Sequence, residues 1–353
     1  MSTPTAPGTS VLRALVARAT LAPSPRNAQP WRWTVHPDHV ELELDRDVAQ
    51  RLAANDPAGR ELTMSCGAAL LTLRVAAAEA LLDAHVDVLP DPHRPELLAA
   101  VTTDPGAIDA AFADLDAVVP LRHTAWSAFD GRPLPDGLAA RLAIEAQVEG
   151  ARLVEVPAGE REALADLVRR ADTERYEDPQ RRAEVAEWIS SRWADEGHVV
   201  PTVAVVPARA AAVRHLGLGD RIAEHEAGLL GGAPYVGVLA TEGDGPADWL
   251  AAGQALQRLL LVAAAEEVLG GFLSAPCQVD GVRAALRDLL PGRPWPQLVL
   301  RLGHARSRPL GTARRPVADV VSVQAGPGED PSSDDGPTRP REATADFTED
   351  TFG

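Results

Sequence analysis

The chain has 353 residues, of which 45% are hydrophobic and 24% charged, a composition that excludes wholesale disorder. Its formal net charge is −17, so nucleic acid and anionic membrane surfaces are not expected partners. Its two cysteines, Cys66 and Cys277, lie far apart, which excludes a disulfide framework and a cysteine-based zinc site. Neither a signal peptide nor a run of about 18 apolar residues is recognisable, so we expect a cytoplasmic protein that does not cross a membrane.

Hydrophobic spacing predicts helices and short strands over most of the chain. In the first part we expect a helix over 10–22, strands over 31–35 and 40–44, a long apolar helix over 60–82 and a strand over 86–88. In the second part we expect helices over 134–147, 159–175, 181–193 and 249–269, with strands over 152–156 and 297–302.

Two segments lack a clear pattern. Residues 195–235 are irregular, with weak strand and helix signals, and a segment of this length is often a lid or a binding loop. Residues 324–353 form an acidic tail rich in Pro, Ser, Gly and Asp, which is predicted to be disordered.

Two apolar segments resemble each other. CGAALLTLRVAAAEALL at 66–82 and AGQALQRLLLVAAAEEVL at 252–269 coincide at an offset of 186, for example Gly67 with Gly253. Alanine-rich buried helices can look alike by chance. Alternatively, the segments are copies of one helix packed across a pseudo-twofold axis, a dimer interface made intramolecular. The repeat by itself leaves both interpretations open.

A motif follows the first predicted helix. In APSPRNAQPWRW (22–33), prolines stiffen a turn that fixes Ser24 and Asn27, whose side chains can hydrogen-bond a heterocycle. The segment resembles the motif APS..N.QPW of the nitroreductase superfamily. The alternative is a turn that only ends the helix.

The order of the motifs is similar to one branch of that superfamily. LRHTAWSAFDGRP (121–133) resembles the family's opening, RRS.R.F...P, and the segment 300–321 resembles its ending, RRP..DV. In ordinary nitroreductases the opening precedes APS..N.QPW, whereas here it follows. The Acg branch has this order, and there one chain resembles two fused, diverged nitroreductase subunits that keep a single flavin site.

This resemblance, over residues 10–322, implies a fold and a domain organisation. The fold is α+β, with a mixed, mainly antiparallel sheet and flanking helices in a pseudo-dimer of two diverged repeats. We expect the first half over 10–118 and the second over 119–323, with a candidate lid at 195–235. The fused chain would be a monomer, and its further association is left open.

The resemblance also implies FMN as the cofactor, NAD(P)H as co-substrate and a small-molecule electron acceptor such as a nitroaromatic or a quinone. The FMN phosphate is a dianion, and the family motifs provide Arg122, Thr124 and Arg315 for it. The alternative for 314–315 is a solvated basic turn. Backbone N–H groups around Ser274 would meet flavin N5. The expected cofactor-binding residues are Ser24, Arg26, Asn27, Arg122, Thr124, Ser274, Arg314 and Arg315.

Two positions depart from the family pattern. His123 and Trp126 stand where the pattern has positive residues, so the phosphate site has fewer charges. We predict no catalytic side chain, because the flavin carries the chemistry, and no metal site. Three functions remain open: an NAD(P)H-dependent FMN oxidoreductase, a flavin-sequestering protein with a lid and no turnover, and a structural protein without flavin.

Overall fold

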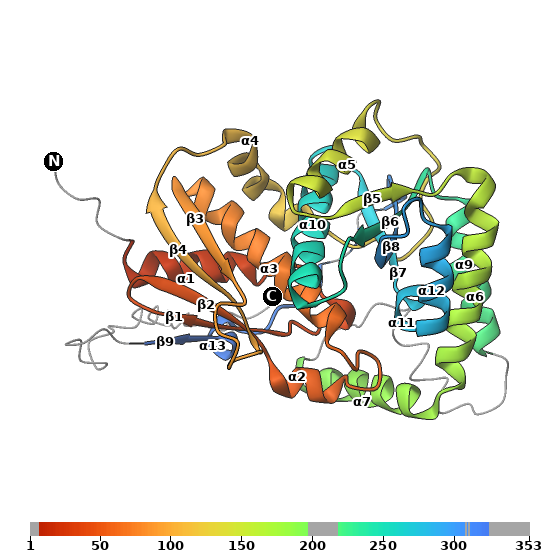
Figure 1. The fold of residues 1–353 in the computed structure, drawn as a ribbon, viewed down its shortest axis with the longest axis horizontal. Helices are drawn as coiled ribbons and strands as arrows, with labels where there is room; N and C mark the ends of the chain where they lie inside the picture. Colours follow the sequence, from red (N-terminus) through yellow and green to blue (C-terminus); the bar gives the residue numbers. More distant parts are fainter. Residues whose placement is uncertain (1–6, 197–217, 308, 310, 325–353) are drawn as a thin grey trace, which may run out of the picture.

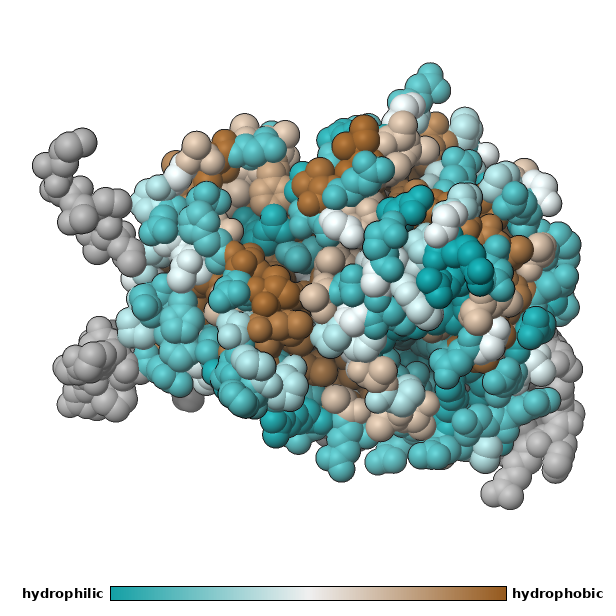
Figure 2. Space-filling model, viewed as in Figure 1, coloured by the Kyte–Doolittle hydropathy of each residue, from teal (hydrophilic) through white to brown (hydrophobic). Residues whose placement is uncertain are grey.

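The computed structural model describes residues 7–196, 218–307, 309 and 311–324. Two β-sheets lie side by side, and two long helices, α3 (Arg60–Glu79) and α10 (Pro246–Ala265), pack between them (Figure 1). The predicted disordered tail lies, except for its first residue, outside the described residues. The face seen in Figure 2 is mostly hydrophilic, and its apolar residues are confined to patches.

The first sheet has the strand order β3-β4-β2-β1-β9. Its neighbours are antiparallel except for β1 and β9, which are parallel. In β1, Trp31, Trp33 and Val35 are buried, and they pack with α1 and α3 in one core. The elements of this part are α1 (Thr9–Ala19), β1 (Trp31–Val35), β2 (His39–Leu44), α2 (Arg46–Arg51), α3, β3 (Leu82–Val88), β4 (Leu97–Pro105), α4 (Ala110–Ala113) and, from the end of the chain, α13 (Val317–Val320) and β9 (Val321–Val323).

The second sheet has the order β5-β6-β8-β7, with antiparallel neighbours throughout. Strand β6 is buried at every position because α10 covers one face of the sheet while α6 and α12 cover the other. The elements are α5 (Leu138–Val148), β5 (Arg152–Glu155), α6 (Arg161–Glu177), α7 (Pro179–Glu196), α9 (Leu218–Gly231), β6 (Tyr235–Thr241), α10, β7 (Leu269–Leu273), α11 (Ala275–Gln278), α12 (Asp280–Leu289) and β8 (Trp295–Gly303). The expected α+β fold with a mixed, mainly antiparallel strand arrangement is confirmed.

The two sheets share one topology. The order β3-β4-β2-β1 of the first sheet corresponds to β7-β8-β6-β5 of the second. In the sequence, a helix precedes the first strand of each sheet (α1 before β1, α5 before β5), and a long helix follows the second strand (α3 after β2, α10 after β6). They differ in one connection. A tight hairpin turn joins β1 to β2, whereas residues 156–234 join β5 to β6 and contribute α6, α7 and α9.

The two long helices touch through their backbones. A Cβ atom on Gly67 would lie 2.2 Å from the Leu250 carbonyl oxygen, and one on Gly253 would lie 1.9 Å from the Met64 carbonyl oxygen. Met64 and Leu250 are themselves related by the offset of 186 that relates the two glycines. The contact of Gly67 with Leu250 is therefore repeated, with the helices exchanged, by the contact of Gly253 with Met64, which is the geometry of an isologous contact.

Both helices end earlier in the sequence than predicted, and for the same reason. α3 stops at Glu79 rather than at residue 82, because Leu81 takes a left-handed conformation (φ 61°) before β3. α10 runs from 246 to 265 rather than from 249 to 269, and Glu267 (φ 57°) precedes β7. Positions 81 and 267 are again related by the offset of 186.

The prediction of an irregular segment over 195–235 was wrong for 218–231, which form α9, while 197–217 lie outside the described residues. Strands β4, β6 and β7 had not been predicted. By length and hydropathy α3 could cross a membrane, but 94% of its apolar stretch is buried inside the protein, and within the described ranges it alone passes that test. It is the central helix of the core.

Candidate functional site

A cavity of about 1390 Å³ lies between segments from both parts of the fold. It is lined by the turn after α1, by α3, by the segment 122–128, by α6, α7 and α9, by the turn from β7 into α11, and by residues 311–314. Seven of the eight predicted cofactor residues line it: Ser24, Arg26, Asn27, Arg122, Thr124, Ser274 and Arg314. The fold thus gathers residues that are far apart in the sequence around one space.

The turn after α1 has an unusual backbone. Arg26, Asn27 and Gln29 have φ values of 51°, 56° and 50°, a left-handed conformation that costs roughly 1–3 kcal/mol for each such residue. The Ser24 hydroxyl oxygen accepts a hydrogen bond from the Gln29 N–H at 2.9 Å and so stabilises the turn. Three of the seven left-handed non-glycine residues in the described part of the chain lie in this turn, and such clusters are common at binding sites.

Residues near the C-terminus hold this turn. The Asn27 side chain donates to the Ala313 carbonyl at 2.8 Å, and the Gln29 side-chain oxygen accepts from the Arg315 N–H at 2.9 Å. Asn27 is thus a bridge between the turn and residues 311–314 of the cavity wall.

Two arginines, the buried Arg122 and the half-buried Arg314, form a cationic region beside the turn. Arg122 is 5% exposed, its Nη2 donates to the Leu21 carbonyl at 3.4 Å, and its Nε has no hydrogen-bond partner among the described residues. Arg314 donates to the carbonyls of Thr20 and Leu21 at 2.9 and 3.1 Å. Burial, and then the nearby charge of Arg314, lower the pKa of Arg122 to about 9. A dianion bound here would offset both the cost of burying the Arg122 guanidinium and its repulsion by Arg314.

The segment after Arg122 runs beside β7. Thr124 forms a parallel bridge with Gly270, and the Ala125 N–H donates to the Gly270 carbonyl at 2.8 Å. His123 and Trp126 also line the cavity, and Trp126 is 44% exposed. The two departures from the family pattern therefore lie in the cavity wall.

Arg315 is the one expected cofactor residue outside the cavity lining. Its guanidinium donates to the Gln29 carbonyl and to the Asp45 carboxylate, both at 3.4 Å. Asp45 also caps α2 by accepting from the backbone N–H groups of Asp47 and Val48. The Arg315 side chain thus connects the C-terminal segment to the first sheet.

Arg26 lies in the cavity wall at the strained turn. Its Nη2 donates to the Asn55 side-chain oxygen at 3.3 Å, and burial, followed by the charge of Arg175, lowers its pKa to about 10.

The cavity also holds an acidic pair that sequence reasoning missed. Glu226 of α9 and Asp172 of α6 both line it. Burial, and then Asp172, raise the pKa of Glu226 to about 7, and burial raises the pKa of Asp172 to about 6. These carboxyl groups can hold a proton near neutral pH, as a general acid must. Asp172 lay on a predicted amphipathic helix and Glu226 in the segment predicted to be irregular, so the sequence carried no signal that brings them together.

Helix α7 is fastened across the cavity to the first part of the fold. Its Glu184 accepts hydrogen bonds from the backbone N–H groups of Ala54 and Asn55 at 2.6 and 3.1 Å and from the Asn55 side chain at 2.6 Å. Trp188 of α7 is 5% exposed and packs with Val48 of α2 and the residues around it. Helices α7 and α2 lie beside each other in Figure 1. α7 is therefore a wall that would have to move for the cavity to open on this side.

No family model matches the chain. A protein of Mycobacterium tuberculosis strain H37Rv named "putative NAD(P)H nitroreductase" is 32% identical over 329 residues, which cover 89% of this chain and 92% of that protein. The protein of the same strain named "putative NAD(P)H nitroreductase acg" is 29% identical over 331 residues, which cover 90% and 97% of the two chains.

Among solved structures, a nitroreductase-like protein from Bacillus cereus matches 60% of this chain and 96% of its own, with 14% identity and a TM-score of 0.37. An FMN-dependent nitroreductase from Mycobacterium smegmatis matches 57% and 95%, with 18% identity and a TM-score of 0.35. The family assignment rests on the mycobacterial relatives alone, because their similarity extends over most of both chains. The chain belongs to the nitroreductase family, in its Acg-like branch.

Proposed function

We propose that this protein is an FMN oxidoreductase that passes a hydride from NAD(P)H to a nitroaromatic, a quinone or a similar small acceptor. The observation that carries the proposal is Arg122, a buried arginine in the cavity wall whose Nε has no partner among the described residues and whose neighbour is Arg314. One buried and one half-buried guanidinium group at one end of a large cavity suit the phosphate of FMN. The relatives named as NAD(P)H nitroreductases support the same reading.

The residues present fit FMN. Arg122, Arg314 and Thr124 would hold the phosphate, and Ser24, Arg26 and Asn27 of the strained turn would lie along the ring system, with Ser274 at the turn after β7. FMN bound there would supply the hydride carrier between nicotinamide and acceptor. The chain itself positions the ring, excludes water behind α7 and holds a proton on Glu226 or Asp172.

A second function is favoured by one observation, the fastening of α7 by Glu184. A wall held by three hydrogen bonds suits a protein that keeps FMN from solvent without turning it over. In this proposal the lid expected at 195–235 contains α9 and also α7, so it begins before residue 195.

We also propose that the chain arose by internal duplication, with halves at 10–118 and 119–323, and that it works in the cytoplasm as a monomeric pseudo-dimer. The shared strand order and the reciprocal contacts of Gly67 and Gly253 support the duplication.

An absorbance spectrum of the purified protein from about 300 to 550 nm tests the proposal, because bound flavin absorbs there. Flavin bands that bleach on addition of NADPH under nitrogen, and return with a nitroaromatic or quinone, would support the oxidoreductase. Bands that NADPH leaves unchanged would support sequestration. Protein that neither carries nor takes up FMN would overturn both.

A further inference from the structure

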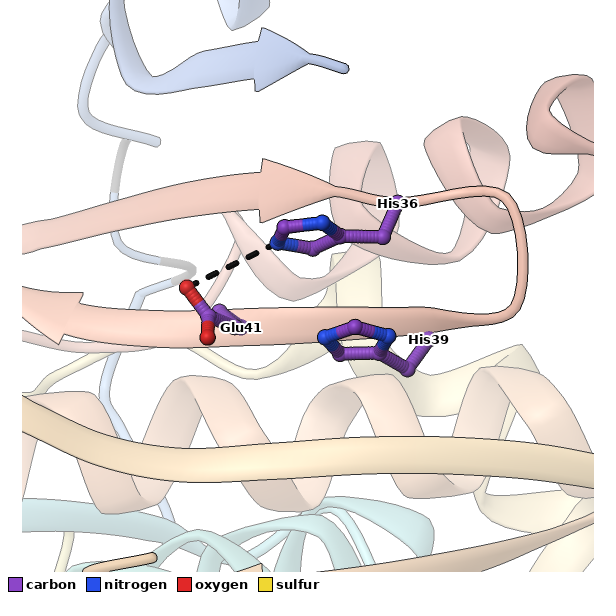
Figure 3. Close-up of side chains that lie close together, drawn as sticks. All are labelled: His36, His39 and Glu41. Carbon is purple, nitrogen blue, oxygen red and sulfur yellow. Dashed lines mark ion pairs between the residues drawn. The ribbon is translucent and has the colours of Figure 1, made fainter. Parts of the chain in front are cut away.

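Two histidines and a glutamate converge on the hairpin between β1 and β2, away from the cavity. His36 and His39 flank the turn, and the His36 N–H donates to the His39 carbonyl at 2.8 Å. Their rings are stacked, with centroids 4.1 Å apart and planes 4° apart. Figure 3 shows both rings extending toward Glu41 on the second strand of the hairpin. None of the three residues lines the cavity.

The donor atoms lie close to the spacing that a metal ion requires. One nitrogen of each histidine and one oxygen of Glu41 lie within 4.8 Å of one another, and His36 Nε2 is 3.6 Å from Glu41 Oε2. In a tetrahedral zinc site with bonds of about 2.0–2.2 Å, adjacent ligand atoms are about 3.3–3.5 Å apart. Side-chain rotations alone can close the difference, because the tight hairpin already fixes the backbone.

The surroundings prepare these atoms for a cation. His36 Nε2 is buried without a hydrogen-bond partner among the described residues. His39 Nδ1 lies 2.8 Å from the Asp38 carboxylate. When that nitrogen carries the proton, Nε2 keeps its lone pair, as in the carboxylate–histidine pairs that orient ligands in zinc sites.

The local charge is negative. Arg94 donates to both Glu41 and Glu43 at 2.7–2.9 Å, and Asp38 is paired with His39. The three carboxylates of Asp38, Glu41 and Glu43 outnumber the one guanidinium, so a divalent cation would offset the excess negative charge.

We propose that His36, His39 and Glu41 form a binding site for a divalent transition-metal ion of the zinc type. Two imidazoles and one carboxylate make a nitrogen and oxygen ligand set that zinc accepts, and a water molecule takes the fourth position. The site ties the two strands of the hairpin together. Because the ion binds the folded hairpin and not the unfolded chain, it stabilises the first sheet.

The test is a titration of the metal-free, untagged full-length protein with Zn²⁺ by isothermal calorimetry. We expect one saturable site, and His39→Gln should weaken it at least about tenfold because a ligand is lost. His85→Gln is the matched control, since His85 lies on the same face of the sheet, where Thr102 pairs with both His39 and His85. It should bind Zn²⁺ as the wild type does.

A second measurement protects the result against a folding defect. Zn²⁺ should raise the melting temperature of the wild type and of His85→Gln, but not that of His39→Gln, whose circular dichroism spectrum should match the wild type. Equal affinity of His39→Gln and wild type, or no saturable uptake of Zn²⁺ by the wild type, would overturn the proposal.

Discussion

Replacing Arg122 by glutamine should move stability and FMN affinity in opposite directions. Burial and Arg314 lower the pKa of Arg122 from 12.5 to about 9, which at 1.36 kcal/mol per unit corresponds to a cost on the order of 5 kcal/mol for the charged form in the flavin-free protein. The guanidinium is charged in both folded and unfolded chains at pH 7, so the full cost applies there and declines only above about pH 9. Removing it should stabilise the flavin-free protein by roughly 1–3 kcal/mol once the cavity left by the shorter side chain is counted.

The same substitution should also remove the charge-assisted hydrogen bond that we propose between Arg122 and the FMN phosphate. Such a bond contributes on the order of 1.5–3 kcal/mol, so the Kd for FMN should rise about tenfold to a hundredfold. Thermal denaturation of the flavin-free protein measures the first effect, and quenching of flavin fluorescence during titration measures the second. A more stable protein that binds FMN less tightly is the joint result that a buried phosphate-binding arginine predicts.

Arg315→Gln is the control, because Arg315 points out of the cavity toward Asp45. It should lower stability by about 1 kcal/mol, the contribution of an ordinary hydrogen bond, and leave the Kd for FMN within about threefold. Weaker FMN binding by Arg315→Gln than by Arg122→Gln would refute the placement of the phosphate. So would an unchanged Kd in Arg122→Gln.

Three further outcomes are expected. Gly67→Ala and Gly253→Ala should each destabilise the protein by about 3 kcal/mol or more in urea denaturation, since each Cβ meets a carbonyl oxygen, whereas Gly281→Ala, which meets open space, should change stability by less than about 1 kcal/mol. Glu184→Gln should speed FMN release roughly tenfold in a dilution experiment followed by fluorescence, and equal rates in Glu184→Gln and wild type would show that α7 is not the gate. Glu226 has a pKa raised from 4.5 to about 7, so its contribution to stability is present below pH 4.5 and lost as the pH rises to about 7, and Glu226→Gln should flatten the fall of melting temperature in that window.

The elements with strong periodicity could be predicted from the sequence, and those that depend on pairing could not. The apolar helix patterns placed α3 and α10, and the glycines at the offset of 186 marked their contact. Strand β6 is buried on both faces, so its sequence shows no alternation from which a strand could be inferred. Strand β7 was missed: the helix predicted over 249–269 reached its first residue, and only residues 266–268, with the left-handed Glu267, separate α10 from the strand.

The residues of the candidate site could likewise be predicted only in part. The turn motif pointed to Ser24 and Asn27 because proline and asparagine fix local geometry, and both line the cavity. The sequence could not show which of Arg314 and Arg315 faces the cavity, because neighbouring side chains in an extended segment point in opposite directions. The fold shows that Arg314 lines the cavity and that Arg315 contacts Asp45. Glu226 becomes a cavity residue only when α9 packs against α6, a long-range contact with no local signature.

The long connection between β5 and β6 is the reason to expect one flavin in the pseudo-dimer that we propose. In the first sheet the equivalent connection is the tight turn after β1, which contributes nothing to the cavity, whereas residues 156–234 bring α6, α7 and α9 to its wall. The residues proposed for the phosphate come together once: Arg122 and Arg314 meet beside the turn after α1, whereas the turn after α5, at 149–151, does not line this cavity. Under the proposed duplication, one half carries the strained turn and the other carries the helical wall, and a single site needs both. Heat denaturation of the loaded protein should release one equivalent of FMN per chain, and release of two equivalents would mean that each half had kept a site of its own.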